Sequence, residues 1–189
     1  FGSGDYNGLD IKIEMFGNHS IPNLWHLYFP SGQNALSTAA RLLSAVSALL
    51  VVGGLLAAFR ARTDDPMRIA AQACAVLVAM LLVPVYTYEH HLVFAIPAMV
   101  LAMVALLRGW LSPRWAVPIG VALPILAYDL PPIRQFALRV VTTEHAAPYF
   151  WVQEMKFFAL LAVGLAVAWL GATAFDDPSR PPPPRPLAD

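Results

Sequence analysis

Long apolar runs alternate with short polar segments along most of this chain. Five runs, at residues 42–59, 69–86, 91–107, 115–128 and 157–175, contain no Asp, Glu, Lys or Arg. A helix needs roughly 17 to 25 mainly apolar residues to cross a membrane, because the hydrocarbon core is ~30 Å thick and a helix rises ~1.5 Å per residue. We therefore predict about five transmembrane helices, forming a bundle over residues 36–176.

The fourth run is the shortest of the five and carries Pro118 and Pro124. We expect it to be kinked, partly re-entrant, or a tilted span that its flanks complete. The bundle is bounded by an extramembrane segment at 1–35 and by the Pro-rich tail at 177–189. The tail has too few apolar residues to pack into a core and is predicted to be disordered.

Two polar-flanked segments have the pattern of short helices that lie on a membrane surface. In SIPNLWHLY, Ser20 is a suitable N-cap and Pro22 suits a first turn. One apolar face would carry Ile21, Leu24, Trp25 and Tyr28, and a second helix would carry Ile133, Phe136, Ala137, Val140 and Val141. We expect Trp25 and Tyr28 to lie at the membrane interface.

Composition supports an all-α, polytopic membrane protein. Hydrophobic residues make up 58% of the chain and charged residues 13%, against ~25% charged in an ordinary soluble domain. The net charge is zero and no basic stripe is present, so nucleic acid is not an expected partner. The single cysteine, Cys74, excludes an internal disulfide.

Arginine and lysine predict the orientation of the bundle, because cytoplasmic loops retain them. If all five runs cross, one side receives Arg60, Arg62, Arg68, Arg108, Arg114, Arg180 and Arg185, and the other receives Lys12, Arg41, Arg134, Arg139 and Lys156. We therefore place residues 1–35, 87–91 and 129–156 on the extracytoplasmic side and the C-terminal tail in the cytoplasm.

A polar segment, TYEHH at 87–91, separates the second and third apolar runs. Neighbouring helical residues point about 100° apart, so His90 and His91 need a local distortion to reach one point. Zinc requires three or four ligands, and no HxxxH or CxxC spacing supplies them, so we expect no metal. Two readings remain. The histidines either cap a helix at the interface, or hydrogen-bond a phosphate or sugar hydroxyl while Glu89 orients them.

The string TYEHHLVFAIPAMV resembles the histidine-pair motif of the glycosyltransferase family 87 membrane mannosyltransferases. Upstream, FGNHS, with Gly17, Asn18 and Ser20, is similar to the GNxS element of that family, and the two motifs occur in the family's order. The resemblance implies a GT-C fold enzyme of the bacterial plasma membrane. Such enzymes transfer a sugar, typically mannose, from a polyprenyl phosphate to a lipid-linked or glycan acceptor on the outer face. Apart from this lipid donor, no cofactor is expected.

The resemblance covers roughly the C-terminal half of such an enzyme and has two departures. The third residue of the GNxS element is commonly Gln and is His19 here, while His26 and Arg41 both compete for the place of an arginine that follows it. Enzymes of this superfamily carry their catalytic acid in a first extracytoplasmic loop, which we expect upstream of Phe1. The expected partner is therefore an upstream half of the same protein or a second membrane subunit. Asp5 and Asp10 fit better as solvated loop acids.

The resemblance assigns His91, His90 and Glu89 to the catalytic centre, and Asn18, His19, Ser20, His26, Arg41 and Tyr88 to substrate binding. A histidine would contact the phosphate or sugar, and Arg41 would pair with the lipid phosphate. Arg41 could equally extend from an interfacial position to water. Tyr88 could stack on the sugar or belong to the aromatic belt of the interface.

Two other classes of function are compatible with the pattern. In a non-enzymatic subunit, the helices would support a larger complex and TYEHH would only cap a helix. In a transporter, Pro97, Pro118 and Pro124 would break helices around a proton-coupled site. The polar residues lie at the rim of the bundle, whereas transport sites lie near the midplane, which disfavours a transporter.

Overall fold

The computed structural model describes residues 5–6, 9–10, 18–29, 31, 36–60, 63–84, 86–87, 89–127 and 154–173. Most of these residues are helical. The elements are β1 (Asp5–Tyr6), β2 (Leu9–Asp10), α1 (Ile21–Tyr28), α2 (Thr38–Ala58), α3 (Pro66–Leu82), the 3-10 helix η1 (Glu89–Ala95), α4 (Ile96–Leu107), the 3-10 helix η2 (Pro113–Trp115), α5 (Ala116–Ala127) and α8 (Met155–Thr173). The two strands form a short antiparallel pair that the sequence did not predict.

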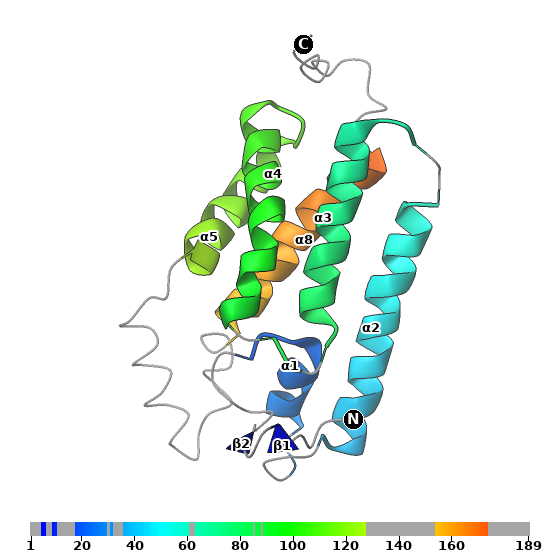
Figure 1. Ribbon diagram of the computed structural model, residues 1–189, viewed down its shortest axis with the longest axis vertical. Coiled ribbons are helices and arrows are strands. Elements are labelled where there is room, and N and C mark those ends of the chain that lie inside the picture. The colour runs from blue at the N-terminus through cyan, green and yellow to red at the C-terminus, as the bar shows by residue number, and fades with distance from the viewer. Residues whose placement is uncertain are drawn as a thin grey trace.

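The long helices run alternately up and down, and α1 lies across one end of them (Figure 1). Helix α8 is central, because it packs against α3, α4 and α5. Of its most apolar stretch, 44% is buried, compared with 6% for α2. Helix α2 therefore stands at the periphery, where its apolar side chains are exposed to the surroundings.

Within the described part of the chain, three helical segments are long and apolar enough to cross a membrane: Thr38–Ala58, His90–Leu107 and Met155–Thr173. Two shorter apolar helices, Pro66–Leu82 and Pro113–Ala127, accompany them. An exposed apolar surface on helices of this length is unfavourable in water and favourable in lipid. The helical fold and the membrane class that the sequence predicted are thus confirmed.

The end predicted for the helix of the second apolar run was wrong. Its helix, α3, ends at Leu82, four residues before the predicted boundary at residue 86. Pro84 has no backbone N–H, so it cannot donate the next hydrogen bond of the helix, although Val83 before it still has helical dihedral angles. The Thr87 hydroxyl then donates a hydrogen bond to the carbonyl oxygen of Leu81. The chain therefore leaves the helix early and turns back across its end.

Helix α1 begins as predicted and buries polar as well as apolar side chains. The Ser20 hydroxyl oxygen accepts a hydrogen bond from the Asn23 N–H at 3.3 Å, which confirms the N-cap. The polar Asn23 and His26 are buried, whereas Tyr28, on the predicted apolar face, is 50% exposed. Ile21 of the predicted apolar face is buried too, and Leu24 and Trp25 pack against the core. Of that face, Tyr28 is thus the residue available to the membrane interface.

At the opposite end of the bundle, an arginine of α3 donates hydrogen bonds to the last turn of α8. Arg68 of α3 donates from Nε to the carbonyl oxygen of Gly171 at 2.9 Å and from Nη2 to that of Ala172 at 2.7 Å. These carbonyls belong to the last turn of α8, where no further helical N–H is available to them. The helix predicted at 133–141 and the Pro-rich tail lie outside the described residues.

Candidate functional site

Buried polar side chains gather at the end of the bundle that α1 covers. Of the eight buried polar side chains among the described residues, seven belong to this group, and each is less than 5% exposed: Asn18, His19, Ser20, Asn23, His26, Thr87 and Glu154. Buried polar groups are costly unless they are hydrogen-bonded, so such a concentration marks a specific structure. We call these seven residues the polar cluster.

Two backbone segments that the sequence singled out meet in the polar cluster. The N–H of His19 donates to the carbonyl oxygen of Thr87 at 2.8 Å. In return, the N–H of Thr87 donates to Oδ1 of Asn18 at 3.0 Å. The FGNHS and TYEHH segments are therefore joined directly by a pair of buried hydrogen bonds, although 69 positions separate Asn18 from Thr87.

A third segment joins the polar cluster through Asn23 of α1. Its side-chain nitrogen Nδ2 donates to the carbonyl oxygen of Asn18 at 2.8 Å and to Oε1 of Glu154 at 2.5 Å. Glu154 immediately precedes α8 and is 1% exposed. The amide of Asn23 thus connects the FGNHS segment to the beginning of the central helix.

Burial changes the acidity of Glu154. Removal from water disfavours the charged form and raises the pKa of this carboxyl group to about 8, while the hydrogen bond from Asn23 lowers it in part. Sequence reasoning missed Glu154, and it also missed Asn23 and Thr87. The sequence did contain one indication of Glu154: it is an acid directly before a long apolar helix. At that position a carboxylate commonly caps the N-terminus of the helix.

The raised pKa predicts that stability falls as the pH rises. A glutamate in the unfolded chain ionises near pH 4.5, whereas folded Glu154 keeps its proton to about pH 8. The contribution of this group to the free energy of unfolding is therefore fully present below pH 4.5. Between pH 4.5 and about pH 8 this contribution decreases by at most roughly 1.4 kcal/mol per pH unit. Thermal unfolding of the detergent-solubilised protein should show this slope for the wild type and lack it for Glu154→Gln. Parallel curves for the two proteins would contradict the assignment, because histidine titrations are common to both.

His90 and His91 lie at the same end of the bundle, at the start of η1. Their ring centroids are 4.0 Å apart and the ring planes are inclined by 53°. The backbone here is a 3-10 helix rather than an α-helix, in which neighbouring residues point about 120° apart, so the helix type by itself does not bring the two rings together. His90 is exposed and His91 is half-buried, so both rings are more accessible than the polar cluster. The side chain of Glu89 and the whole of Tyr88 lie outside the described residues.

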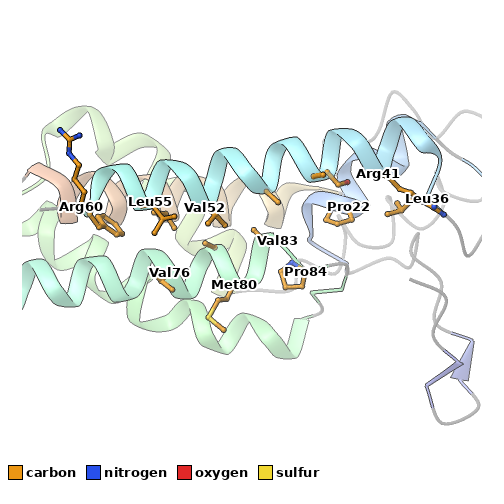
Figure 2. Close-up of a pocket in the computed structure, with 16 residues that line it drawn as sticks. Pro22, Leu36, Arg41, Val52, Leu55, Arg60, Val76, Met80, Val83 and Pro84 are labelled. Carbon is orange, nitrogen blue, oxygen red and sulfur yellow. The ribbon is translucent and has the colours of Figure 1, made fainter. Parts of the chain in front are cut away.

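A long apolar groove of about 1170 Å³ runs between α2 and α3 and ends beside α1 (Figure 2). Arg41 lies at one end and Arg60 at the other, 19 positions along the chain, which corresponds to roughly 28 Å on a helix. Between them the walls are apolar, with Val52, Leu55 and Met80 among the lining side chains.

The Arg41 end of the groove borders the polar cluster. Pro22 and Pro84 line the groove at this end, together with Arg41 and Leu36 (Figure 2). Pro22 lies between the cluster residues Ser20 and Asn23 in the sequence, and Pro84 precedes Thr87 by three positions. A molecule with an apolar chain and a charged or polar head could therefore contact both regions at once.

Over the residues that the structure describes, no group of three His, Cys, Asp or Glu side chains has the geometry of a metal site. Comparison of the chain with protein-family models, with curated proteins and with solved structures finds no match. The chemistry that this site can perform therefore has to be judged from its own residues and from the two short motifs.

Proposed function

We propose that this chain is part of a membrane glycosyltransferase that moves a sugar, mannose in the first instance, from a polyprenyl phosphate to a lipid-linked or glycan acceptor. The observation that carries the proposal is the pair of hydrogen bonds between the FGNHS and TYEHH segments, at the mouth of an apolar groove. These are the two segments that resemble the family 87 mannosyltransferases.

The shape of the site supports an amphiphilic substrate. The groove has apolar walls for a long isoprenoid chain, which would exchange contacts with lipid for close packing contacts with these side chains. Arg41 lies at the mouth, where its guanidinium group would pair with a phosphate. The sugar would then lie beside the segment of Asn18, His19 and Ser20, whose buried side chains would shape the pocket from behind.

The proposal includes a position in the membrane. All five apolar helices would cross, with α3 and the η2–α5 segment completed by their flanks, in the plasma membrane of a bacterium. The polar cluster would face the extracytoplasmic side. Support comes from the opposite end of the bundle, where Arg68 and Arg114 contact the C-terminal half of α8, Arg114 at 5.5 Å from the Trp169 ring, since arginines collect on the cytoplasmic side.

The reaction would break the bond between the anomeric carbon of the sugar and a phosphate oxygen, and form a bond from that carbon to the acceptor hydroxyl oxygen. His91 or His90, together with Arg41, would stabilise the negative charge on the departing phosphate. The proton of the acceptor hydroxyl would pass to a carboxylate. The family resemblance places this carboxylate on a first extracytoplasmic loop of the complete enzyme.

The test is a transfer assay with radiolabelled polyprenyl-phosphate mannose and membranes that contain the native protein. His91→Ala should lower the turnover number by about 100-fold, the usual effect of removing one group that stabilises transition-state charge. Arg108→Ala is the matched control, because this exposed cation lies at the other end of α4 and should leave transfer unchanged. Full activity in His91→Ala would remove that residue from the mechanism. If wild-type membranes transferred no sugar from polyprenyl phosphates, the proposed function itself would fail.

A further inference from the structure

The buried side-chain atoms that have no hydrogen-bond partner among the described residues include Oε2 of Glu154 and Oδ1 of Asn23. These two atoms belong to two groups that are already in contact, because Oε1 of Glu154 and Nδ2 of Asn23 are 2.5 Å apart. Both residues are less than 5% exposed, so bulk water does not satisfy these atoms. An unsatisfied buried polar atom costs about 1–3 kcal/mol, and two of them in a pair of hydrogen-bonded groups call for an explanation.

The protonation state of Glu154 supplies this explanation. An ionised carboxylate only accepts hydrogen bonds, so its Oε2 and the amide oxygen of Asn23 would present lone pairs to each other. A neutral carboxyl group carries one O–H donor in addition to its acceptor oxygen. It therefore matches a primary amide, which also has one donor and one acceptor side.

We propose that Glu154 carries a proton on Oε2 and donates it to Oδ1 of Asn23, closing a two-bond carboxylic acid–amide ring that positions the Asn18–Ser20 segment. The first bond of this ring is the one from Nδ2 of Asn23 to Oε1 of Glu154. Loss of the proton opens the ring, because the second bond then has no hydrogen. Glu154 acts through Asn23 and is a positioning residue.

The surroundings favour the neutral form. Burial is the main influence on the Glu154 carboxyl group and raises its pKa to about 8. The titratable groups on the elements that pack here are His19 and His26 on the α1 side, His90 and His91 on η1, and Lys156 on α8. A cation beside the carboxyl group would favour its ionised form, but burial and the Asn23 hydrogen bond are what set this pKa.

Through this ring, the protonation state of Glu154 would affect the other residues of the polar cluster. The same Nδ2 of Asn23 donates to the carbonyl oxygen of Asn18, and Oδ1 of Asn18 accepts from the N–H of Thr87. Opening the ring therefore leaves the Asn23 amide on Glu154 through the Nδ2 bond alone, so the FGNHS segment is positioned on α8 by one bond instead of two. The consequence for sugar transfer rests on the proposed function, whereas the ring itself does not.

Infrared difference spectroscopy of the whole protein tests the ring without a substrate. Subtracting the spectrum of Glu154→Gln from that of the wild type at neutral pH should leave the carbonyl band of a protonated carboxyl group. This band should give way to carboxylate bands as the pH rises through about 8. Carboxylate bands from Glu154 at neutral pH would overturn the proposal.

Hydrogen exchange of the α1 amides tests the positioning role. A glutamine at position 154 can replace the ring with an amide–amide pair that does not titrate, whereas an alanine cannot. After correction for intrinsic exchange, α1 of the wild type should exchange at least several-fold faster above about pH 8 than below it. Glu154→Gln should show no such change, and Glu154→Ala should exchange rapidly at every pH. If Gln weakened α1 as much as Ala does, the two-bond ring would be refuted.

The pH profile of transfer separates this inference from the proposed function. Wild-type turnover should fall above about pH 8, while Glu154→Gln should keep its turnover there with an unchanged KM for the acceptor. Identical profiles for the two proteins would refute the positioning role while leaving the glycosyltransferase proposal intact. If no transfer occurs in either protein, the proposed function fails, and the spectroscopic and exchange results still decide whether the ring exists.

Discussion

Replacing Ala48 by tryptophan is expected to raise the KM for a long-chain polyprenyl-phosphate donor by about tenfold. Ala48 lines the groove between α2 and α3, and an indole there would occupy space that the isoprenoid chain needs. Overpacking an apolar site costs about 1–3 kcal/mol, and about 1.4 kcal/mol corresponds to that factor in affinity. The measurement is the KM for donors of increasing chain length, in membranes that contain wild-type or variant protein.

The adjacent residue provides the control for this experiment. Leu49 is 72% exposed and lies outside the lining of the groove, so Leu49→Trp adds the same side chain to the same helix on a lipid-facing surface. It should leave the KM unchanged. A donor with a chain too short to enter the groove should be used equally well by wild type and Ala48→Trp. Equal loss in both tryptophan variants would show that the groove does not hold the donor.

Gly164→Ala is expected to destabilise the protein by about 1–3 kcal/mol, the usual cost of overpacking a core. A Cβ atom at Gly164 would lie 2.8 Å from Cγ1 of Val78, where α3 meets the central helix α8. Val78 is 1% exposed, and a β-branched side chain has few alternative rotamers in a helix, so it cannot move aside. Small residues at such helix contacts allow the close approach on which packing in lipid depends.

The same substitution elsewhere in the bundle should have the opposite sign. Nothing lies within 4 Å of a Cβ atom built on Gly53 of α2, so Gly53→Ala should be neutral or stabilising by about 0.5–1 kcal/mol through helix propensity. Unfolding of each variant in mixed detergent micelles gives the free energies. Combining Gly164→Ala with Val78→Ala should recover part of the loss, because the two side chains share one space. Additive losses in the double variant would refute this contact as the cause.

The course of α3 shows how far hydrophobicity alone predicts a membrane helix. The apolar run continues to residue 86, and a helix of that length would have satisfied the lipid equally well. Pro84 and the bond from the Thr87 hydroxyl to Leu81 end the helix at Leu82 instead. The proline was visible in the sequence, but its effect depended on Thr87 finding a partner at the end of the helix.

Helix α1 shows the same difference between what the local sequence predicts and what the tertiary contacts decide. The cap at Ser20 and the first-turn proline are local features, and the sequence predicted both correctly. Which face of α1 is buried depends on the segments that pack against it. The polar Asn23 is buried because Glu154 and the Asn18 carbonyl group offer it hydrogen bonds that water would otherwise supply.

The sequence by itself determined the membrane class, the positions of the apolar helices and the identity of the two polar segments, because each depends on residues close together in the chain. Only the tertiary structure decided which polar groups meet. Asn18 is 69 positions from Thr87, and Asn23 is 131 positions from Glu154. No local periodicity encodes such pairs. They form because buried polar groups must find partners, and the packing of α1 against the ends of α3 and α8 brings these particular partners within reach.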